Sequence, residues 1–303
     1  CVSWGQAHDR TLKVTLVQSN SSQHLNWRSE QRNHTLTLLR EISEQHLDSD
    51  LVIWPENAVP LFRHQAGGFL ADLDTLGRHS QTAFITGIPH WQPEQGSEPQ
   101  QLHNSVIALG MGGQGLYHKQ KLVPFGEYVP MQRLLRGLIQ FFDLPMSDFA
   151  PGAADQSPLA LHQPQRQINI APYICYEIVY PDFVRKAATR SDLLLTISDD
   201  SWFGTSIGPL QHLQMARMRA LENGRYLVRS TNTGITAIID HHGKVIEQAE
   251  QFQQTSLTGE VTLLHGVTPY GRWGSAPVIL LCLLLAAAIR FAPGRITKTV
   301  YLR

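Results

Sequence analysis

Short, β-rich apolar segments alternate along the chain with segments of helical periodicity, and this alternation restricts the possible folds more than any other feature. The strand-like segments lie at 12–17, 51–54, 83–88, 106–109, 115–118, 168–174, 193–197, 226–230, 235–239 and 244–247. Apolar residues recur at helical spacing in 27–47, 69–78 and 209–223. Strands that alternate with helices are typical of layered α/β domains. Because no repeat interrupts the pattern, we expect one α/β domain over residues 11–265.

The composition is that of an ordinary globular protein, and it excludes several kinds of partner. Hydrophobic residues make up 42% of the 303 residues, charged residues 17%, and the formal net charge is zero. The sequence has no basic stripe interleaved with aromatic residues, so we expect no nucleic-acid partner. Its three cysteines, Cys1, Cys175 and Cys282, form neither a disulfide framework nor a Cys-x-x-Cys zinc pair. We therefore expect no metal.

The two ends of the chain differ from the segments between them. Residues 1–10 are polar and the chain begins at Cys1 rather than Met, so we expect a linker from an upstream region that this sequence lacks. Residues 276–289 (APVILLCLLLAAAI) carry no charge, and Tyr270 and Trp273 precede them as an aromatic belt would. We expect a transmembrane helix over 274–293, although the uncharged run is shorter than the ~20 residues that usually span a bilayer.

Basic residues near the C-terminus predict how this helix is oriented. Only Arg272 closely precedes the apolar segment. The basic residues that follow it are Arg290, Arg295, Lys298 and Arg303. Because positive charge accumulates on the cytoplasmic side of membrane helices, we expect a cytoplasmic tail at 294–303 and the α/β domain on the opposite side.

Three of the predicted strands lead to residues with catalytic potential. Glu56 follows 51–54, Lys119 follows 115–118 and Cys175 follows 168–174. Because α/β folds gather reacting groups at strand ends, we expect these side chains to converge. A carboxylate can take the thiol proton, the thiolate can attack a carbonyl and an ammonium can hold the oxyanion, which supports acyl transfer through a thioester. Taken singly, each residue also suits a structural role: a core cysteine, a capping glutamate and a solvated lysine.

Several longer motifs carry a resemblance to a known family. They are Lys119–Pro130 (KQKLVPFGEYVP), Phe142–Met146 (FDLPM), Ile174–Glu177 (ICYE), Leu195–Ser198 (LTIS), Trp202–Gly204 (WFG), Gln211–Arg219 (QHLQMARMR) and Arg229–Asn232 (RSTN). Together with Glu56, they resemble the nitrilase, or carbon–nitrogen hydrolase, superfamily and, within it, the apolipoprotein N-acyltransferase branch. The resemblance extends from Val14 to the C-terminal apolar segment.

The resemblance implies both a fold and an activity. The fold is an α/β, nitrilase-like αββα sandwich followed by a C-terminal transmembrane helix, with an upstream bundle of membrane helices that this chain lacks. The enzyme is implied to lie in the bacterial inner membrane, with its catalytic domain on the periplasmic side. The implied reaction moves a fatty acyl group from a phospholipid donor, through a cysteine thioester, to the N-terminal amine of a diacylglyceryl apolipoprotein acceptor. No cofactor is implied.

The resemblance also implies a role for each candidate site residue. Glu56 matches the general base and Cys175 the acylated nucleophile. Lys119, rather than Lys121, matches the catalytic lysine, because it lies eight residues before the glutamate of the Phe-Gly-Glu motif. The supporting and substrate-contacting positions are Glu127, Tyr176, Glu177, Trp27 and Trp202.

At one position the sequence departs from the family pattern. The family usually shows Ser-Asn-Asp before the Trp-Phe-Gly motif, whereas this chain has Ser198, Asp199 and Asp200. Asp199 therefore introduces a possible negative charge near the site and leaves the local hydrogen bonding open.

Two other functions compete with the acyltransferase. The first is a soluble-type amidase that hydrolyses small C–N bonds with the same three residues; it would require neither the Phe-Gly-Glu-Tyr-Val-Pro motif nor the apolar tail. The second is a catalytically silent domain that binds lipoproteins. The simultaneous presence of Glu56, Lys119 and Cys175 favours an enzyme over the silent domain.

Overall fold

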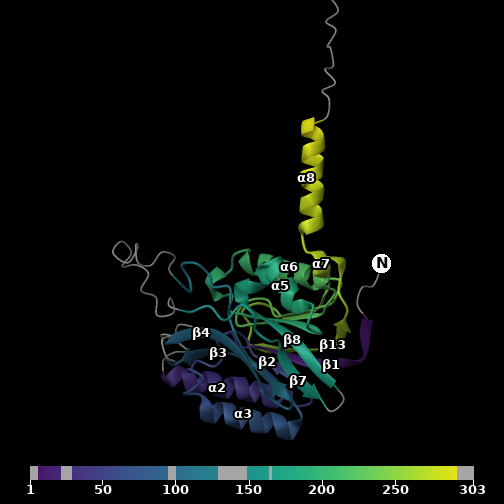
Figure 1. Ribbon diagram of the computed structural model, residues 1–303. Helices are drawn as coiled ribbons and strands as arrows, with labels where there is room; N and C mark the ends of the chain where they lie inside the picture. The colour runs from purple at the N-terminus through teal and green to yellow at the C-terminus, as the bar shows by residue number, and fades with distance from the viewer. Residues whose placement is uncertain (1–5, 22–28, 95–99, 129–148, 164–165, 292–303) are drawn as a thin grey trace, which may run out of the picture.

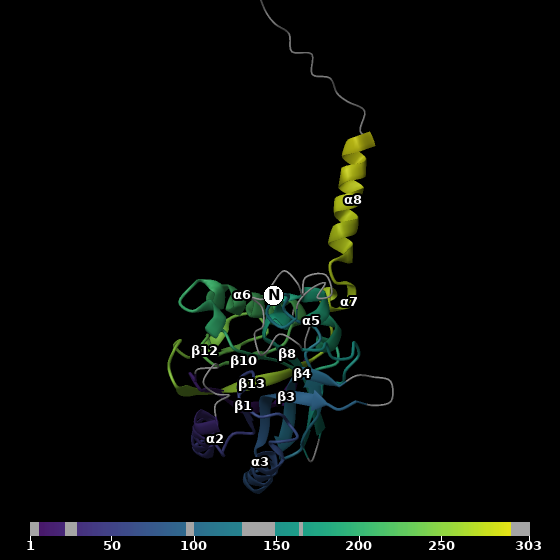
Figure 2. The ribbon, with the colours of Figure 1, turned by 90° about the vertical axis from the view of Figure 1, so that its left-hand side faces the viewer.

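Two β-sheets stacked face to face form the centre of the molecule, and helices cover the outer face of each sheet (Figure 1). The computed structural model describes residues 6–21, 29–94, 100–128, 149–163 and 166–291. From one outer face to the other, these residues form a helix layer, two sheets and a second helix layer (Figure 2). This arrangement confirms the predicted αββα sandwich.

The first sheet has six strands in the order β13-β1-β2-β3-β4-β6. Their bounds are β1 (Gln6–Gln18), β2 (Leu51–Ile53), β3 (Ala83–Gln92), β4 (Gln101–Gly110), β6 (Leu116–His118) and β13 (Thr255–His265). β1, β2 and β3 run parallel, so their carboxyl ends lie at one edge of the sheet. β13 pairs antiparallel with β1 and joins the end of the domain to its beginning.

The second sheet has seven strands in the order β12-β11-β10-β9-β8-β7-β5. Their bounds are β5 (Gly113–Gln114), β7 (Leu159–Gln163), β8 (Arg166–Ile174), β9 (Leu193–Ser198), β10 (Leu227–Thr231), β11 (Ala237–Ile239) and β12 (Val245–Gln248). β8, β9 and β10 run parallel at the centre. All residues of β9 and β10 are buried, as expected for parallel strands covered on both faces.

The helices bury one apolar face each, and a separate core fills the space between the sheets. α2 (Ser29–Glu44) and α3 (Gly67–Ser80) pack on the first sheet, and α5 (Pro181–Ala188) and α6 (Gly208–Asn223) on the second. The shorter helices are η2 (Cys175–Val179), η3 (Ser201–Phe203) and α7 (Pro269–Trp273). The inner core joins residues of both sheets, among them Leu16, Ile53, Ile174 and Leu195. The inner core thus fixes the strand ends of one sheet relative to those of the other.

The N-terminal segment differs from its prediction. Residues 6–10, which the polar composition assigned to a linker, form the first part of β1. Gln6 and Ala7 pair with His265 and Leu264 of β13, and a register shift separates these pairs from the regular ladder that begins at Thr11. Backbone pairing with a distant strand therefore overrides the polar sequence of this segment.

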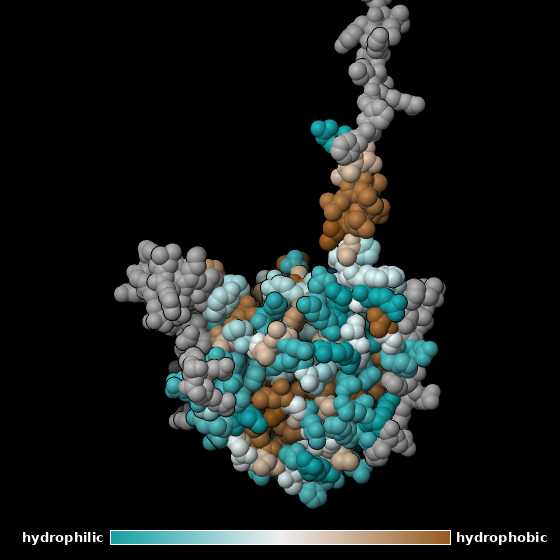
Figure 3. All heavy atoms as spheres, viewed as in Figure 1, coloured by the Kyte–Doolittle hydropathy of each residue, from teal (hydrophilic) through white to brown (hydrophobic). Residues whose placement is uncertain are grey.

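The described part of the C-terminal helix covers 276–291 of the transmembrane segment predicted at 274–293. α8 (Ala276–Phe291) has 16 residues and stands clear of the domain, with an apolar surface that contrasts with the mostly polar domain (Figure 3). At 1.5 Å per residue it is about 24 Å long, less than the ~30 Å of a bilayer core. Among the described residues, no helix is both long and apolar enough to cross a membrane. The expected tail at 294–303 lies outside the described residues.

Candidate active site

The structure brings Glu56, Lys119 and Cys175 together at the ends of strands from both sheets. Glu56 follows β2, Lys119 follows β6 and Cys175 begins η2 directly after β8. Lys119 Nζ lies 3.7 Å from Glu56 Oε1. Cys175 is close enough to both for their charges to shift the pKa of its thiol. The three segments that the sequence singled out therefore form one cluster, and the catalytic role of each remains a prediction.

Lys119 lies between two carboxylates and is almost fully buried, with 1% of its side chain exposed. Its Nζ donates a hydrogen bond of 2.7 Å to Glu127 Oε1. The Asn104 side-chain amide donates to Glu56 Oε1 at 2.7 Å and to Glu127 Oε1 at 3.2 Å. Because one amide group bonds both acids, Asn104 fixes their separation and leaves the lysine between them.

Backbone groups hold the Glu56 carboxylate from the other side. Its Oε2 accepts a hydrogen bond of 2.8 Å from the backbone N–H of Asp199. The chain at Glu56 passes so close to Gly87 of β3 that a Cβ there would lie 2.8 Å from Glu56 Cα and 2.7 Å from the Pro55 carbonyl oxygen. Only glycine leaves room for this approach, so Gly87 helps to set the position of the candidate base.

Cys175 has a strained backbone. Its φ is +52°, a left-handed conformation that non-glycine residues rarely adopt. It sits at the sharp change of direction from β8 into η2, and its side chain is only partly buried. Strain of this kind persists where the surrounding structure holds it, and here it turns the thiol out of the sheet toward Glu56 and Lys119.

Glu177 joins the segments that carry Cys175 and Lys119. Its carboxylate accepts hydrogen bonds from the backbone N–H groups of Gln120 (2.6 Å), Lys121 (3.0 Å) and Ile174 (2.8 Å). The Tyr117 hydroxyl also donates to it, at 3.1 Å to either oxygen. Because these donors come from β6, from the segment after it and from the end of β8, Glu177 fixes the lysine relative to the nucleophile.

The charges of this cluster keep the thiol protonated and the lysine charged. Burial raises the pKa of Cys175 well above its usual range, Glu56 raises it further and Lys119 opposes them. Burial alone would lower the pKa of Lys119, but attraction to Glu56, Cys175 and Glu127 outweighs it and raises the pKa. Burial raises the pKa of Glu56 to about 7, against the attraction of Lys119. Glu56 is therefore poised near neutral pH to take a proton from Cys175.

A second buried network reaches the backbone of Cys175, and the sequence analysis did not predict it. His212 Nε2 donates to the Cys175 carbonyl oxygen at 3.1 Å. His212 Nδ1 lies 3.1 Å from both Asp200 Oδ1 and Arg229 Nη2. Burial and the charge of Arg229 lower the pKa of His212, and Asp200 opposes them. Arg229 in turn bonds Asp200 Oδ2 at 2.6 Å, and Ser198 Oγ donates to Asp200 Oδ1 at 2.8 Å. In the sequence, these residues were indicated only by their place in the motifs at 198–200, 211–219 and 229–232.

The remaining predicted residues lie at varying distances from the cluster. Tyr176 is 37% exposed, and its ring lies 5.8 Å from that of Tyr180. Trp202, in η3, is 64% exposed, and its role as a substrate-contacting residue stays a prediction. The Asp199 side chain accepts from Ser201 N–H and from Asn232, so its carboxylate is held by its own partners. Trp27 lies outside the described residues.

We expect nucleophilic attack by Cys175 to speed up as the pH rises through about 7. Below that pH the Glu56 carboxylate is protonated and cannot take the thiol proton; above it the base is available. Because the charges of Glu56, Lys119 and Cys175 act on one another, the midpoint belongs to the group of interacting residues rather than to Glu56 alone. Alkylation of Cys175 by iodoacetamide, followed by mass spectrometry between pH 5 and 9, measures the profile. Glu56→Gln should lose this step, and an unchanged midpoint in that variant would contradict the assignment of the base.

The cluster supplies the parts needed for covalent acyl chemistry. It combines a thiol, a base beside it and a buried ammonium that can bind a developing oxyanion. The backbone N–H of Tyr176, next to the nucleophile, is a further donor. In the part of the chain that the structure describes, no group of three or more His, Cys, Asp or Glu residues is arranged to hold a metal ion.

Comparison with known proteins places the whole domain in a family. The family model described as carbon-nitrogen hydrolase matches residues 13–265. The apolipoprotein N-acyltransferase of Azotobacter vinelandii is 51% identical over 300 residues, which cover 96% of this chain and 57% of that protein. That of Vibrio parahaemolyticus is 41% identical over 91% of this chain and 55% of that protein. The chain thus spans little more than half the length of these curated relatives.

Solved structures show the same fold at much lower sequence identity. The carbon-nitrogen hydrolase from Helicobacter pylori G27 superposes with a TM-score of 0.60 at 15% identity, over 93% of this chain and 97% of that one. The C. elegans NitFhit protein gives a TM-score of 0.62 at 16% identity, over 90% of this chain and 64% of that one. These likenesses confirm the nitrilase-like sandwich that the sequence predicted.

Proposed function

The chain belongs to the carbon–nitrogen hydrolase family, and from this premise we propose that it catalyses N-acylation of apolipoproteins with a phospholipid as acyl donor. The observation that carries the proposal is the position of the buried Lys119 ammonium, between two carboxylates and beside a partly exposed, strained Cys175. The relatives named apolipoprotein N-acyltransferase support this acceptor over the small amides of the competing amidase hypothesis.

In the first half of the proposed reaction, Cys175 becomes acylated. Glu56 takes the thiol proton, and the sulfur attacks the ester carbonyl carbon of the phospholipid. Lys119 and the Tyr176 N–H stabilise the negative charge that develops on the carbonyl oxygen. The carbon–oxygen bond then breaks, Glu56 returns its proton to the departing oxygen, and a lysophospholipid leaves.

In the second half, the acyl group moves to nitrogen. The α-amine of a diacylglyceryl-cysteine apolipoprotein attacks the thioester carbonyl, and Glu56 takes a proton from the attacking amine. The carbon–sulfur bond breaks and the proton returns to Cys175, so the enzyme is restored and an amide is formed. Water must be kept from the thioester during this exchange, and a site that opens toward lipid would exclude it.

We propose that α8 places the domain against the bacterial inner membrane, with the catalytic domain on the periplasmic side. Leu280, Leu281 and Leu283 of this helix are 56–63% exposed, which is a large unpartnered apolar surface. Insertion of α8, which is about 24 Å long, would bury these side chains in the apolar part of a bilayer. A helix that spans the ~30 Å bilayer core would need further residues beyond α8. Tyr270 and Trp273, which immediately precede α8, suit the membrane–water interface.

Acyl transfer in phospholipid vesicles tests this proposal directly. The chain is mixed with phosphatidylethanolamine–phosphatidylglycerol vesicles and a diacylglyceryl-cysteine peptide. We expect it to float with the vesicles, to carry a fatty acyl adduct on Cys175 and then to acylate the peptide amine. Release of ammonia from small amides, with no acyl transfer from lipid, would replace the proposal with the amidase.

A further inference from the structure

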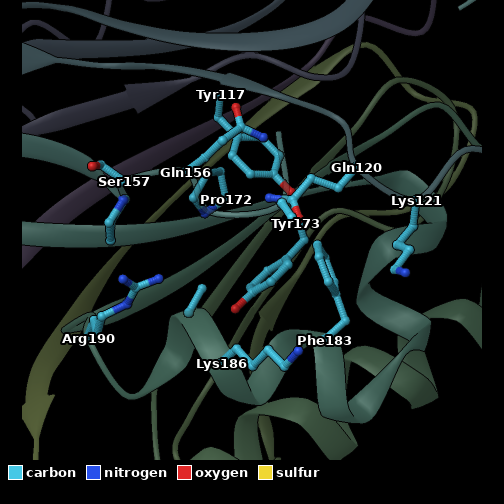
Figure 4. A pocket seen from close by; sticks show the side chains of 13 residues that line it. Tyr117, Gln120, Lys121, Gln156, Ser157, Pro172, Tyr173, Phe183, Lys186 and Arg190 are labelled. Carbon is cyan, nitrogen blue, oxygen red and sulfur yellow. The ribbon is translucent and has the colours of Figure 1, made fainter. Parts of the chain in front are cut away.

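A cationic cavity lies beside the candidate active site, behind the segment that carries Lys119. Its volume is about 160 Å³, and its walls come from the segment after β6, from the loop before β7 and from α5 (Figure 4). Three of its lining side chains are cations, namely Lys121, Lys186 and Arg190, and none is a carboxylate. A concave surface that gathers charge of one sign concentrates the electrostatic potential and favours a ligand of the opposite sign.

The cations of this cavity are poorly neutralised by the protein. Among the described residues, no carboxylate lies within ion-pair distance of Lys121 or Lys186, and Lys121 Nζ instead lies 5.9 Å from the centre of the Phe183 ring. Arg190 bonds Asp155 at 3.2 Å, but both side chains are more than half exposed, so that pair is weak. The cavity therefore keeps a net positive charge that an anion would offset.

The two tyrosine hydroxyl groups on the cavity wall already have internal partners. Tyr117 donates to Glu177, and Tyr173 donates to the Val184 carbonyl oxygen. The Gln156 side-chain amide is bonded to both the backbone N–H and the carbonyl oxygen of His118. Because these groups are bonded within the fold, they fix the shape of the cavity wall, and the ammonium and guanidinium groups are its charged groups for a ligand.

An apolar cavity adjoins the cationic one, and Gln120 and Lys121 line both. This second cavity has a volume of about 430 Å³ and is otherwise lined by Leu122, Pro124, Tyr128, Phe149, Pro151 and Tyr180. The ring of Tyr180 lies 5.8 Å from that of Tyr176, the residue after the nucleophile. The apolar cavity therefore shares a wall with the cationic cavity and is linked through Tyr180 to the segment that carries the nucleophile.

We propose that the two cavities together bind one phosphate-bearing amphiphile, with its phosphate in the cationic cavity, which Lys121, Lys186 and Arg190 line from different sides (Figure 4), and its hydrocarbon in the apolar cavity. Arg and Lys are the side chains that bind phosphate oxygens best, Arg through two parallel hydrogen bonds. This inference rests on the proposed function, because it assigns the phosphate of the acyl donor to a specific place. It predicts that recognition of the acyl donor depends on its phosphate group.

Binding of short-chain lipids to the whole chain tests this site without any need for turnover. The ligands are dihexanoylphosphatidylglycerol, dihexanoylglycerol, glycerol phosphate and inorganic phosphate, measured by calorimetry in a Cys175→Ala background that cannot be acylated. We expect the phospholipid to bind more tightly than either phosphate compound alone. Lys186→Gln combined with Arg190→Gln should weaken phospholipid binding by about tenfold or more and leave dihexanoylglycerol unaffected, since two charge-assisted contacts are lost.

A control variant separates this site from general charge. Lys244→Gln combined with Arg40→Gln removes the same charge from exposed positions outside the cavity and should bind the phospholipid as the parent does. Equal phospholipid affinity in the cavity variant and the parent would overturn the inference, and so would inorganic phosphate that binds as tightly as the phospholipid. The cavity substitutions are then made in the enzyme with Cys175 intact, and the KM for the phospholipid donor is measured. Acyl transfer with an unchanged KM would refute the proposed binding site and leave the proposed function standing. Phospholipid binding at the cavity without acyl transfer would refute the function and leave the site standing.

Discussion

Cys175→Ser should lower the rate of acyl transfer by at least about 10³-fold, a loss of roughly 4 kcal/mol in transition-state stabilisation. The hydroxyl is nearly isosteric with the thiol, so the left-handed backbone at this position and the contacts of Glu177 and His212 should remain. What changes is the nucleophile: a serine hydroxyl is far less acidic than a thiol, and Glu56, with a pKa of about 7, is too weak a base to activate it. The initial rate of peptide acylation in vesicles measures the loss.

The other described cysteine supplies a matched control for this experiment. Cys282 lies on α8 and is exposed, outside the cluster of charges that surrounds Cys175. Cys282→Ser should keep the parental rate and the acyl adduct on Cys175. Parental activity in Cys175→Ser, or an adduct that moves to Cys282, would show that acyl transfer does not pass through the proposed thioester.

The parts of the fold that the sequence predicted are those with strong local signals. β9 and the second half of β8 were visible as mostly apolar runs, because strand residues that are buried on both faces of a sheet are mostly apolar. α6 was predicted as Pro209–Asn223 and runs from Gly208 to Asn223, with proline in its first turn and Gly224 in the left-handed conformation at its end. In each case the periodicity and the end signals agree with the tertiary packing.

The elements that escaped prediction depend on partners far away in the chain. β13 pairs with β1 from the opposite end of the domain, and half-buried positions along it hide the alternation of a strand. β7 lies in a stretch rich in proline and glutamine and is fixed by its antiparallel neighbour β8. α5 has only eight residues, too few for a clear helical period. The predicted membrane span at 274–293 stays a prediction, since its last two residues lie outside the described part of the chain.

The candidate site, like the fold, was predictable where a local motif marks a residue and not where a residue acts through contacts with distant segments. Motif spacing selected Lys119 over Lys121, and in the structure Lys119 is the buried lysine between Glu56 and Glu127, whereas Lys121 is exposed. The groups that position the cluster were not predictable in the same way. Asn104 bonds both acids from the middle of β4, and its short polar side chain is unremarkable in sequence. His212 reaches the Cys175 carbonyl across 37 residues. Such hydrogen-bond partners can be identified only in the folded structure, where the two sheets bring distant segments together.

Lys119→Met should slow acyl transfer strongly and also destabilise the fold. The substitution removes the ammonium that would hold the oxyanion, and loss of one such donor costs about 10²–10³-fold in rate. It also leaves Glu56 and Glu127 buried side by side, joined by the Asn104 amide with no cation between them. Breaking a buried ion pair from one side typically costs about 3–5 kcal/mol. The rate of peptide acylation and the midpoint of thermal unfolding measure the two effects.

The loss of stability in Lys119→Met should depend on pH, with a sign that identifies its cause. The attraction of Lys119 now holds down the pKa of Glu56, which burial raises to about 7, so without the lysine that pKa should rise further above its value in the unfolded chain. A folded state that binds more protons than the unfolded state loses stability as the pH rises. The variant should therefore be closest to the parent near pH 5 and furthest from it near pH 8. Lys121→Met, at an exposed position two residues away, should unfold at the parental temperature at both pH values. A deficit in Lys119→Met that is the same at pH 5 and pH 8 would mean that lost packing, rather than two uncompensated carboxylates, is its source.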